Sequence, residues 1–125
     1  MIPAILHYIW IGGKPLPERF RANLDTWRRL NPDFEVREWN ESNLDWSSRY
    51  MRAAYMFRYW SRVTNLARLQ VLKAHGGIYL DVDVEMVRSL HPVLDNACFV
   101  GFQDPGAHAN WVNNAVFGAA LVSAT

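Results

Sequence analysis

Apolar and polar positions follow one another along this chain in patterns that predict strands and helices in turn. Short apolar runs predict buried strands, and apolar residues spaced three and four positions apart predict amphipathic helices. The predicted elements are strands at 4–11, 34–39, 78–84 and 97–102, and helices at 17–30, at 45–60 and from a cap at Thr64 or Asn65 to about 74. Residues 112–120 are apolar, and their pattern does not distinguish a strand from a helix.

This order of elements predicts an α/β fold, in which a mainly parallel sheet is flanked by helices. Ligands of such sheets bind beyond the carboxyl ends of the strands. Two segments with polar and aromatic side chains, 7–10 and 81–83, follow or close predicted strands in this way. We therefore expect a binding site where these two segments meet.

The segment from Gly76 to Val84 is the most informative part of the chain. Gly76 is well placed to end the preceding helix in a left-handed conformation. Side chains alternate along the predicted strand, so Asp81 and Asp83 are expected on one face, together with Tyr79 and Glu85. Two carboxylates on one face repel each other, and a divalent cation that also binds phosphate oxygens would relieve the repulsion. The alternative is that the acidic residues lie where a strand reaches solvent.

Arg68 lies on a helix that is apolar nearly all round, three residues after Asn65. A buried arginine needs an anionic partner, here either a carboxylate such as Asp81 or a ligand phosphate or sugar. A solvated or purely structural arginine is the alternative. Trp10, at the end of the first strand, could stack on a nucleobase or fill the core. The histidines show no spacing typical of a metal site.

Composition limits the classes of function. The 125 residues suffice for one domain, and the net charge of +1 does not favour nucleic acid as a partner. No apolar run is long enough for a membrane span, and no signal peptide is evident. A single cysteine excludes an internal disulfide. We therefore expect a cytoplasmic protein.

These motifs, taken together, resemble a known family. The residues that carry the resemblance are His7–Gly13 (HYIWIGG), Trp27, Asn31–Asp33 (NPD), Trp39, Arg68 and Gly76–Asp83 (GGIYLDVD). In this order they resemble the DXD sugar transferases of glycosyltransferase family 32, which include mannosyltransferases and capsule or lipopolysaccharide sugar transferases. The nucleotide-sugar core of the large clostridial glucosylating toxins is also similar.

The resemblance implies a minimal GT-A fold, a UDP- or GDP-sugar donor, Mn²⁺ or Mg²⁺, and a glycan acceptor of unknown structure. It implies that Trp10 stacks on the nucleobase and that Arg68 and Tyr79 contact the donor's sugar or ribose. Asp81 would hold sugar or ribose hydroxyls and reach the metal through water, and Asp83 would bind the metal directly. Asp81, Asp83 and Arg68 are thus the expected catalytic residues, and transfer is expected with retention of configuration.

Two departures from the family pattern lead to alternatives. Asn65, an expected donor-binding residue, stands where the family usually has an aspartate. Residues 113–118 resemble the family's next segment, but acceptor contacts and a further metal ligand normally follow, so we expect a single domain at 1–125 without that part. The chain is then either a transferase that transfers or slowly hydrolyses the sugar, or a non-catalytic nucleotide-sugar binding module.

A third hypothesis is a homo-oligomer, because the middle of the chain is rich in aromatic residues. Large exposed apolar patches usually mark interfaces. The residues concerned are Trp46, Tyr50, Tyr55, Phe57, Tyr59 and Trp60.

Overall fold

A five-stranded mixed sheet forms the centre of the molecule, and the computed structural model describes residues 1–102 and 112–121. The elements are β1 (Ile5–Ile9), α1 (Glu18–Leu30), β2 (Glu35–Trp39), α2 (Arg49–Met56), α3 (Trp60–His75), β3 (Gly77–Leu80), the 3₁₀ turn η1 (His91–Val93), β4 (Cys98–Phe102) and β5 (Val112–Ala119). The strand order is β2-β1-β3-β5-β4. β1 pairs in parallel with β2 and β3, whereas β5 runs antiparallel to β3 and β4.

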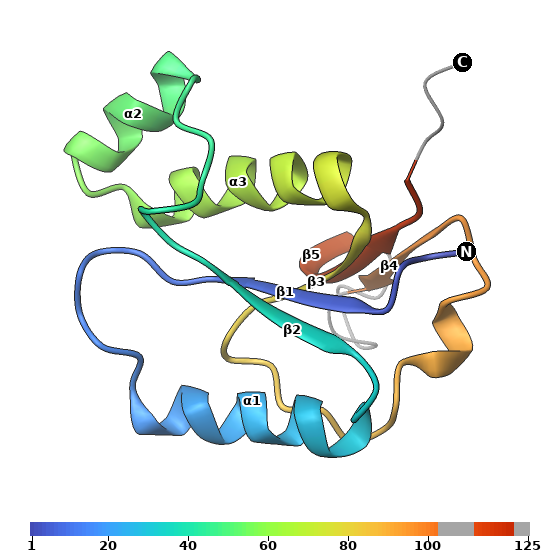
Figure 1. Cartoon of the computed structure of the whole chain (residues 1–125). Helices are drawn as coiled ribbons and strands as arrows, with labels where there is room; N and C mark the ends of the chain where they lie inside the picture. The colour runs from blue at the N-terminus through green and yellow to red at the C-terminus, as the bar shows by residue number, and fades with distance from the viewer. Residues whose placement is uncertain (103–111, 122–125) are drawn as a thin grey trace.

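The α/β fold predicted from the sequence is confirmed, and helices cover both faces of the sheet (Figure 1). α1 packs on one face, where Leu24 and Trp27 join Leu6 and Ile78 in the larger core. α2 and α3 cover the other face, and the second core forms there. Parallel pairing is confined to β2, β1 and β3, and the ambiguous segment 112–120 forms a strand. None of the helices in the described part of the chain has the length and apolar character needed to cross a bilayer.

The boundary between α2 and α3 differs from the prediction. α2 begins only at Arg49, because the Ser48 side chain accepts a hydrogen bond from the backbone N–H of Met51. The chain then turns at Arg58, which has a φ of 60°. α3 therefore begins at Trp60, and Thr64 and Asn65 lie inside the helix instead of capping it.

The end of α3 is fixed to β1 through the buried His7. Trp39 Nε1 donates to His7 Nδ1 at 3.0 Å, so Nε2 carries the proton and donates to the Gly76 carbonyl at 2.8 Å. Gly76 ends the helix, as predicted, and has a positive φ of 65°, but its ψ of −171° lies outside the left-handed helical region. At Gly77, an added Cβ would lie 2.9 Å from His7 Nε2, so only glycine fits between α3 and β3. These contacts set the start of β3 and hence the position of its carboxyl end.

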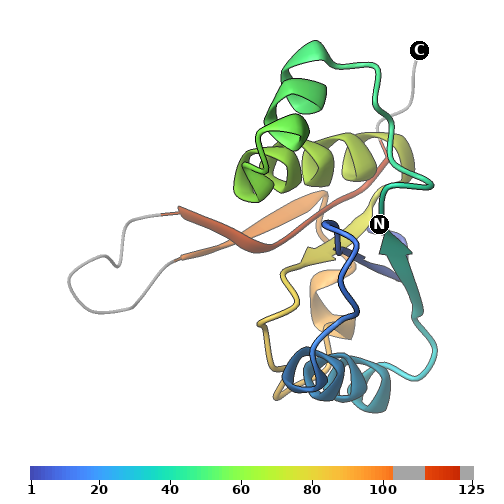
Figure 2. The same cartoon turned by 90° about the vertical axis from the view of Figure 1, so that its left-hand side faces the viewer.

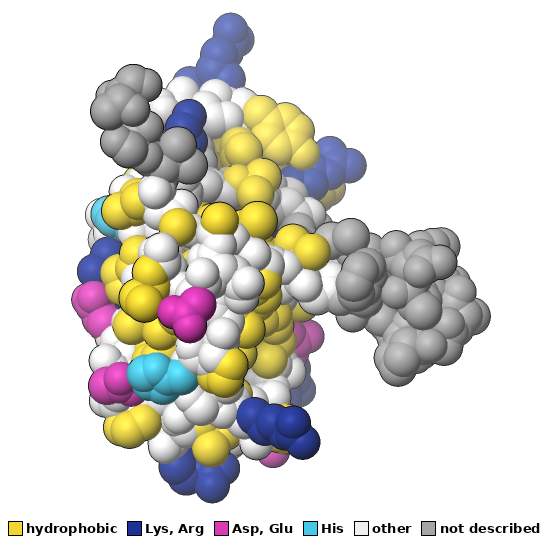
Figure 3. Space-filling view, turned by 90° about the vertical axis from the view of Figure 1, so that its right-hand side faces the viewer, with side chains coloured by type: hydrophobic (Ala, Val, Ile, Leu, Met, Phe, Trp, Pro, Cys, Tyr) yellow, Lys and Arg dark blue, Asp and Glu magenta, His cyan; other side chains and the backbone are white. Residues whose placement is uncertain are grey.

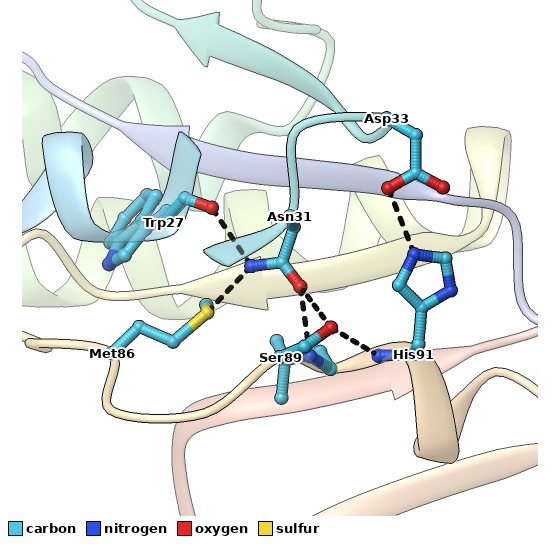
Figure 4. A network of polar contacts seen from close by, with 7 residues as sticks. Trp27, Asn31, Asp33, Met86, Ser89 and His91 are labelled. Carbon is cyan, nitrogen blue, oxygen red and sulfur yellow. Dashed lines mark hydrogen bonds and ion pairs between the residues drawn. The ribbon is translucent and has the colours of Figure 1, made fainter. Parts of the chain in front are cut away.

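The segment after β3 is held against the end of α1 by a polar network around Asn31 (Figure 4). Asn31 is fully buried, and its amide nitrogen donates to the Trp27 carbonyl and to Met86 Sδ. Its Oδ1 accepts from the Ser89 hydroxyl and from the Leu90 N–H. Each polar atom of this buried amide thus has a partner, which is what a buried polar group requires.

Candidate functional site

A pocket lies at the carboxyl ends of the parallel strands β1 and β3, as the predicted fold class required. Both strands end on the left in Figure 1, close to the loop between β1 and α1. The pocket has a volume of about 300 Å³. Its lining includes Trp10, Trp60, Thr64, Tyr79, Asp81 and Asp83. The opposite side of the molecule, seen in Figure 3, shows apolar side chains across its middle, with Lys and Arg near its upper and lower ends.

The two aspartates lie in a turn and not on a strand, which corrects the sequence prediction. β3 ends at Leu80, and the Asp81 N–H makes the last bond to the neighbouring strand, at the Ala115 carbonyl. The Val84 N–H then donates to the Asp81 carbonyl at 3.0 Å and closes the turn. Side-chain alternation along a strand therefore does not extend to Asp83 or to Glu85.

Side chains of α1 explain why the strand stops there. Asn23 Nδ2 donates to the Val82 carbonyl at 2.9 Å, and Trp27 Nε1 donates to the Val84 carbonyl at 2.8 Å. Backbone groups that would continue a sheet ladder are bonded to the helix instead. The turn still places Asp81 and Asp83 together at the edge of the pocket, with Asp81 partly buried and Asp83 exposed.

The Asp81 side chain is fixed by a charged neighbour, Arg68, and a neutral one, Tyr79. Arg68 Nη2 lies 3.1 Å from Asp81 Oδ1, and the Tyr79 hydroxyl donates to the same oxygen at 2.8 Å. Arg68 is buried, and its guanidinium carbon lies 4.4 Å from the centre of the Tyr79 ring, as in a cation–π contact. The sequence predicted either a carboxylate such as Asp81 or a ligand as the partner of a buried Arg68, and the structure pairs Arg68 with Asp81.

Tyr79 serves as a hydrogen-bond donor across the whole physiological pH range. Burial raises the pKa of the Tyr79 phenol, and the nearby carboxylate of Asp81 raises it further, while the Arg68 charge opposes both. The phenol therefore keeps its proton and continues to donate to Asp81. Arg68 is held in turn by α3, since its Nε donates to the Thr64 carbonyl at 3.1 Å.

Trp10 both packs on the core and lines the pocket. Its Nε1 donates to the Lys14 carbonyl at 2.7 Å, and its ring meets the edge of Phe20 at 5.8 Å between centroids. The side chain is partly buried against the larger core. The two alternatives drawn from the sequence are therefore compatible at this position, because one tryptophan has enough surface for both.

Asn65 is exposed on α3 and does not line this pocket. Trp60 and Thr64 line it instead, and the sequence reasoning assigned neither to the site. Helical periodicity could have found them, because positions 60, 64 and 68 are spaced four residues apart and share one face of α3. The error followed from placing the start of this helix at residue 64 or 65.

The carboxylates could hold a divalent cation only with additional ligands. Over residues 1–102 and 112–121, no group of three or more His, Cys, Asp or Glu side chains is arranged to hold a metal. Asp81 and Asp83 are nevertheless adjacent at an open pocket, and Mg²⁺ is commonly bound by one or two carboxylates plus substrate phosphates. The two carboxylates thus fit a cation whose remaining ligands are the phosphate oxygens of a bound nucleotide.

The chain is similar in sequence to known glycosyltransferases. The family described as "Glycosyltransferase sugar-binding region containing DXD motif" matches residues 17–100. An uncharacterised glycosyltransferase of Acanthamoeba polyphaga mimivirus is 26% identical over 124 residues, which cover 93% of this chain and 49% of that protein. Inositol phosphoceramide mannosyltransferase 3 of Schizosaccharomyces pombe is 28% identical, over 87% of this chain and 32% of the relative.

The fold has a counterpart among solved structures. The PaToxG glycosyltransferase superimposes with a TM-score of 0.76 at 20% identity, over 96% of this chain and 56% of that one. This likeness supports the GT-A fold. The chain spans about a third to a half of the length of the curated relatives that it matches.

Proposed function

We propose a function from the premise that this chain belongs to the family of glycosyltransferase sugar-binding regions containing a DXD motif. The pocket binds a nucleoside-diphosphate sugar together with a divalent cation. The bound donor, a UDP- or GDP-sugar, would lose its sugar to a glycan acceptor or, more slowly, to water. The observation that carries the proposal is the fixed Asp81 carboxylate, held by Arg68 and Tyr79, with Asp83 beside it at the open edge.

Each site residue has a role that its position allows. Trp10 offers an aromatic face to the nucleobase. Arg68, Tyr79 and Asp81 form a preorganised polar group that orients the ribose or sugar hydroxyls. Asp83, with Asp81 through water, would hold Mn²⁺ or Mg²⁺, which when bound neutralises charge on the departing diphosphate. Asn65 is exposed and outside the pocket lining, so its contact with the donor stays a prediction, as does retention of configuration.

Isothermal titration with UDP- and GDP-sugars tests the binding step, in Mn²⁺ and in chelator. We expect Asp83→Asn to weaken Mn²⁺-dependent donor binding at least tenfold, equivalent to about 1.4 kcal/mol. Asp95→Asn, at another exposed aspartate, is the matched control and should bind as the parent does. Equal donor affinity for Asp83→Asn and the parent in Mn²⁺ would refute the assigned metal role.

A second candidate function is a nucleotide-sugar binding module without turnover. The neutral Asn65, in place of the usual carboxylate, favours it. Asn65→Asp separates the two candidates: if it raises hydrolysis of a bound donor, the chain contains the remaining catalytic groups. If neither protein releases sugar while both bind donor, the binding module is the better description.

Self-association remains a separate proposal with a smaller surface than the sequence indicated. Trp46 and Trp60 each pack edge-to-face on Tyr55, with centroids 5.0 and 5.2 Å from its ring, and all three are partly buried. Of the six aromatic residues named from the sequence, Tyr50, Phe57 and Tyr59 are at least half exposed. Sedimentation that gives a monomer at all concentrations would exclude this homo-oligomer. The cytoplasmic location is likewise a prediction from the sequence.

A further inference from the structure

A second, larger pocket adjoins the donor pocket and is not needed for any role given above. It lies between the loop after β1 and the junction of α2 with α3, which face each other on the left of Figure 1. Figure 2 shows this side from the front, with the loop below α2 and the start of α3. Its volume is about 500 Å³, and Trp10, Ile11 and Trp60 line both pockets. A ligand here would lie next to a bound donor.

The lining of this second pocket combines aromatic rings with positive charge. Tyr55 and Met56 join the two tryptophans, and Lys14 and Arg58 supply the charged groups, with no carboxylate among the lining residues. Neither Lys14 nor Arg58 makes an ion pair with any carboxylate in the described ranges. Two cations without a carboxylate partner favour an anionic ligand, and aromatic faces suit the C–H surface of a sugar ring.

Arg58 occupies a backbone position at which glycine would be favoured. The Tyr59 N–H donates to the Ala54 carbonyl, and the Arg58 N–H donates to the Tyr55 carbonyl, which is the hydrogen-bond pattern of a Schellman helix end. The residue in the left-handed position of that motif is usually glycine, but here it is Arg58 with a φ of 60°. A side chain kept at a strained position beside a pocket indicates a role in binding.

The walls of the pocket are fixed relative to each other by Glu41. One carboxylate oxygen, Oε2, accepts from the Gly12 N–H and from the Tyr55 hydroxyl, each at 2.8 Å. The loop after β1 is thereby tied to α2. Gly12 also lies against the Trp60 ring, since an added Cβ would be 3.6 Å from it. The pocket is thus preorganised, which lowers the entropic cost of binding.

We propose that this second pocket binds the phosphate group of a phosphorylated acceptor, with Arg58 and Lys14 as the phosphate-binding residues. The inference rests on the proposed sugar transfer. A nucleobase carries no net charge, and the diphosphate of the donor is assigned to the cation at Asp83 in the first pocket. No charged group of the donor is therefore assigned to Arg58 or Lys14. A second, anionic substrate would give both residues a ligand.

The source of the phosphate is either a soluble sugar phosphate or a phospholipid headgroup, and two probes distinguish them. Calorimetry with glucose 6-phosphate tests the first source. Co-sedimentation with phosphatidylglycerol vesicles, compared with phosphatidylcholine vesicles, tests the second. Binding to one probe that Arg58→Gly and Lys14→Gln each weaken about tenfold supports the proposal and identifies the source. If neither probe binds the parent protein, the proposal is wrong.

Arg58→Gly separates binding from folding, because the substitution should stabilise the protein. We expect its urea midpoint to rise while phosphate binding falls, and Arg58→Lys should restore most of the binding. Arg49→Gln, at an exposed arginine outside the pocket, is the matched control and should change neither. The affinity for UDP and GDP with Mn²⁺ should change less than twofold in all four variants.

That last measurement keeps this proposal distinct from the proposed function. If Arg58→Gly weakens UDP or GDP as much as the phosphate probe, the pocket belongs to the donor and the acceptor assignment is overturned. If the parent binds a phosphate probe but no nucleotide, the donor proposal fails while the phosphate site remains.

Discussion

Mild acid should destabilise this protein through one buried histidine, His7. His7 has no exposed surface, and burial lowers its pKa from 6.5 to about 4, although the hydrogen bond to Gly76 opposes the shift. Protonation would also place a second N–H on Nδ1, which accepts from Trp39. The folded protein therefore keeps His7 neutral.

The sign and size of the effect follow from linkage. Above the unfolded pKa of 6.5 the imidazole is neutral in both states, and the stability is fully present. As the pH falls below that value, His7 is protonated in the unfolded chain, whereas in the folded chain it stays neutral down to about pH 4. At about 1.4 kcal/mol per pKa unit, the free energy of unfolding should drop by about 3 kcal/mol over this window.

Urea unfolding followed by tryptophan fluorescence, between about pH 7 and about pH 4.5, measures this loss. The matched variant is His7→Gln, whose amide can both donate to Gly76 and accept from Trp39 but does not titrate. Other groups contribute equally to both proteins, so the difference between them isolates His7. Parallel pH profiles for the parent and His7→Gln would refute the reasoning.

Three substitutions test other contacts by urea unfolding and donor titration. Arg68→Met should lower the free energy of unfolding by about 2 kcal/mol, less than the loss of a fully buried ion pair, because the Asp81 side chain left behind is 31% exposed. Unchanged stability would show that the Arg68–Asp81 pair does not stabilise the fold. Gly77→Ala should cost about 3 kcal/mol or more, since its Cβ would lie 2.9 Å from His7 Nε2 and φ is 103°; a cost below about 1 kcal/mol would mean that this contact relaxes easily. Asn31→Ala should cost about 2 kcal/mol, because buried polar groups lose their partners, and an unchanged urea midpoint would show that water replaces them.

The pattern of local residues was sufficient for much of the fold. The helix predicted at 17–30 is α1 (Glu18–Leu30), because its apolar spacing and the flanking Pro17 and Asn31-Pro32 act within the segment itself. The strand predicted at 34–39 is β2 (Glu35–Trp39). The helix end at Gly76 was predictable for the same reason, since glycine's conformational freedom is a property of the residue.

Where the prediction was wrong, contacts from distant residues decided the structure. Alternation continued through Asp83, but Asn23 and Trp27 of α1 bind the carbonyls of Val82 and Val84 and end β3 early. The polar run around Thr64 looked like a helix start, but the turn at Arg58 had already begun α3 at Trp60. Neither cause lies within the segment that was misjudged.

The sequence alone determined the chemical groups of the site: Trp10, Arg68, Tyr79 and the two aspartates, in an α/β order that places strand ends together. Only the tertiary structure decided their arrangement. It paired Arg68 with Asp81, and it brought Trp60 and Thr64 into the pocket while leaving Asn65 exposed. The physical reason is that residue type and spacing act locally, whereas an ion pair or a pocket depends on elements packed together from distant parts of the chain.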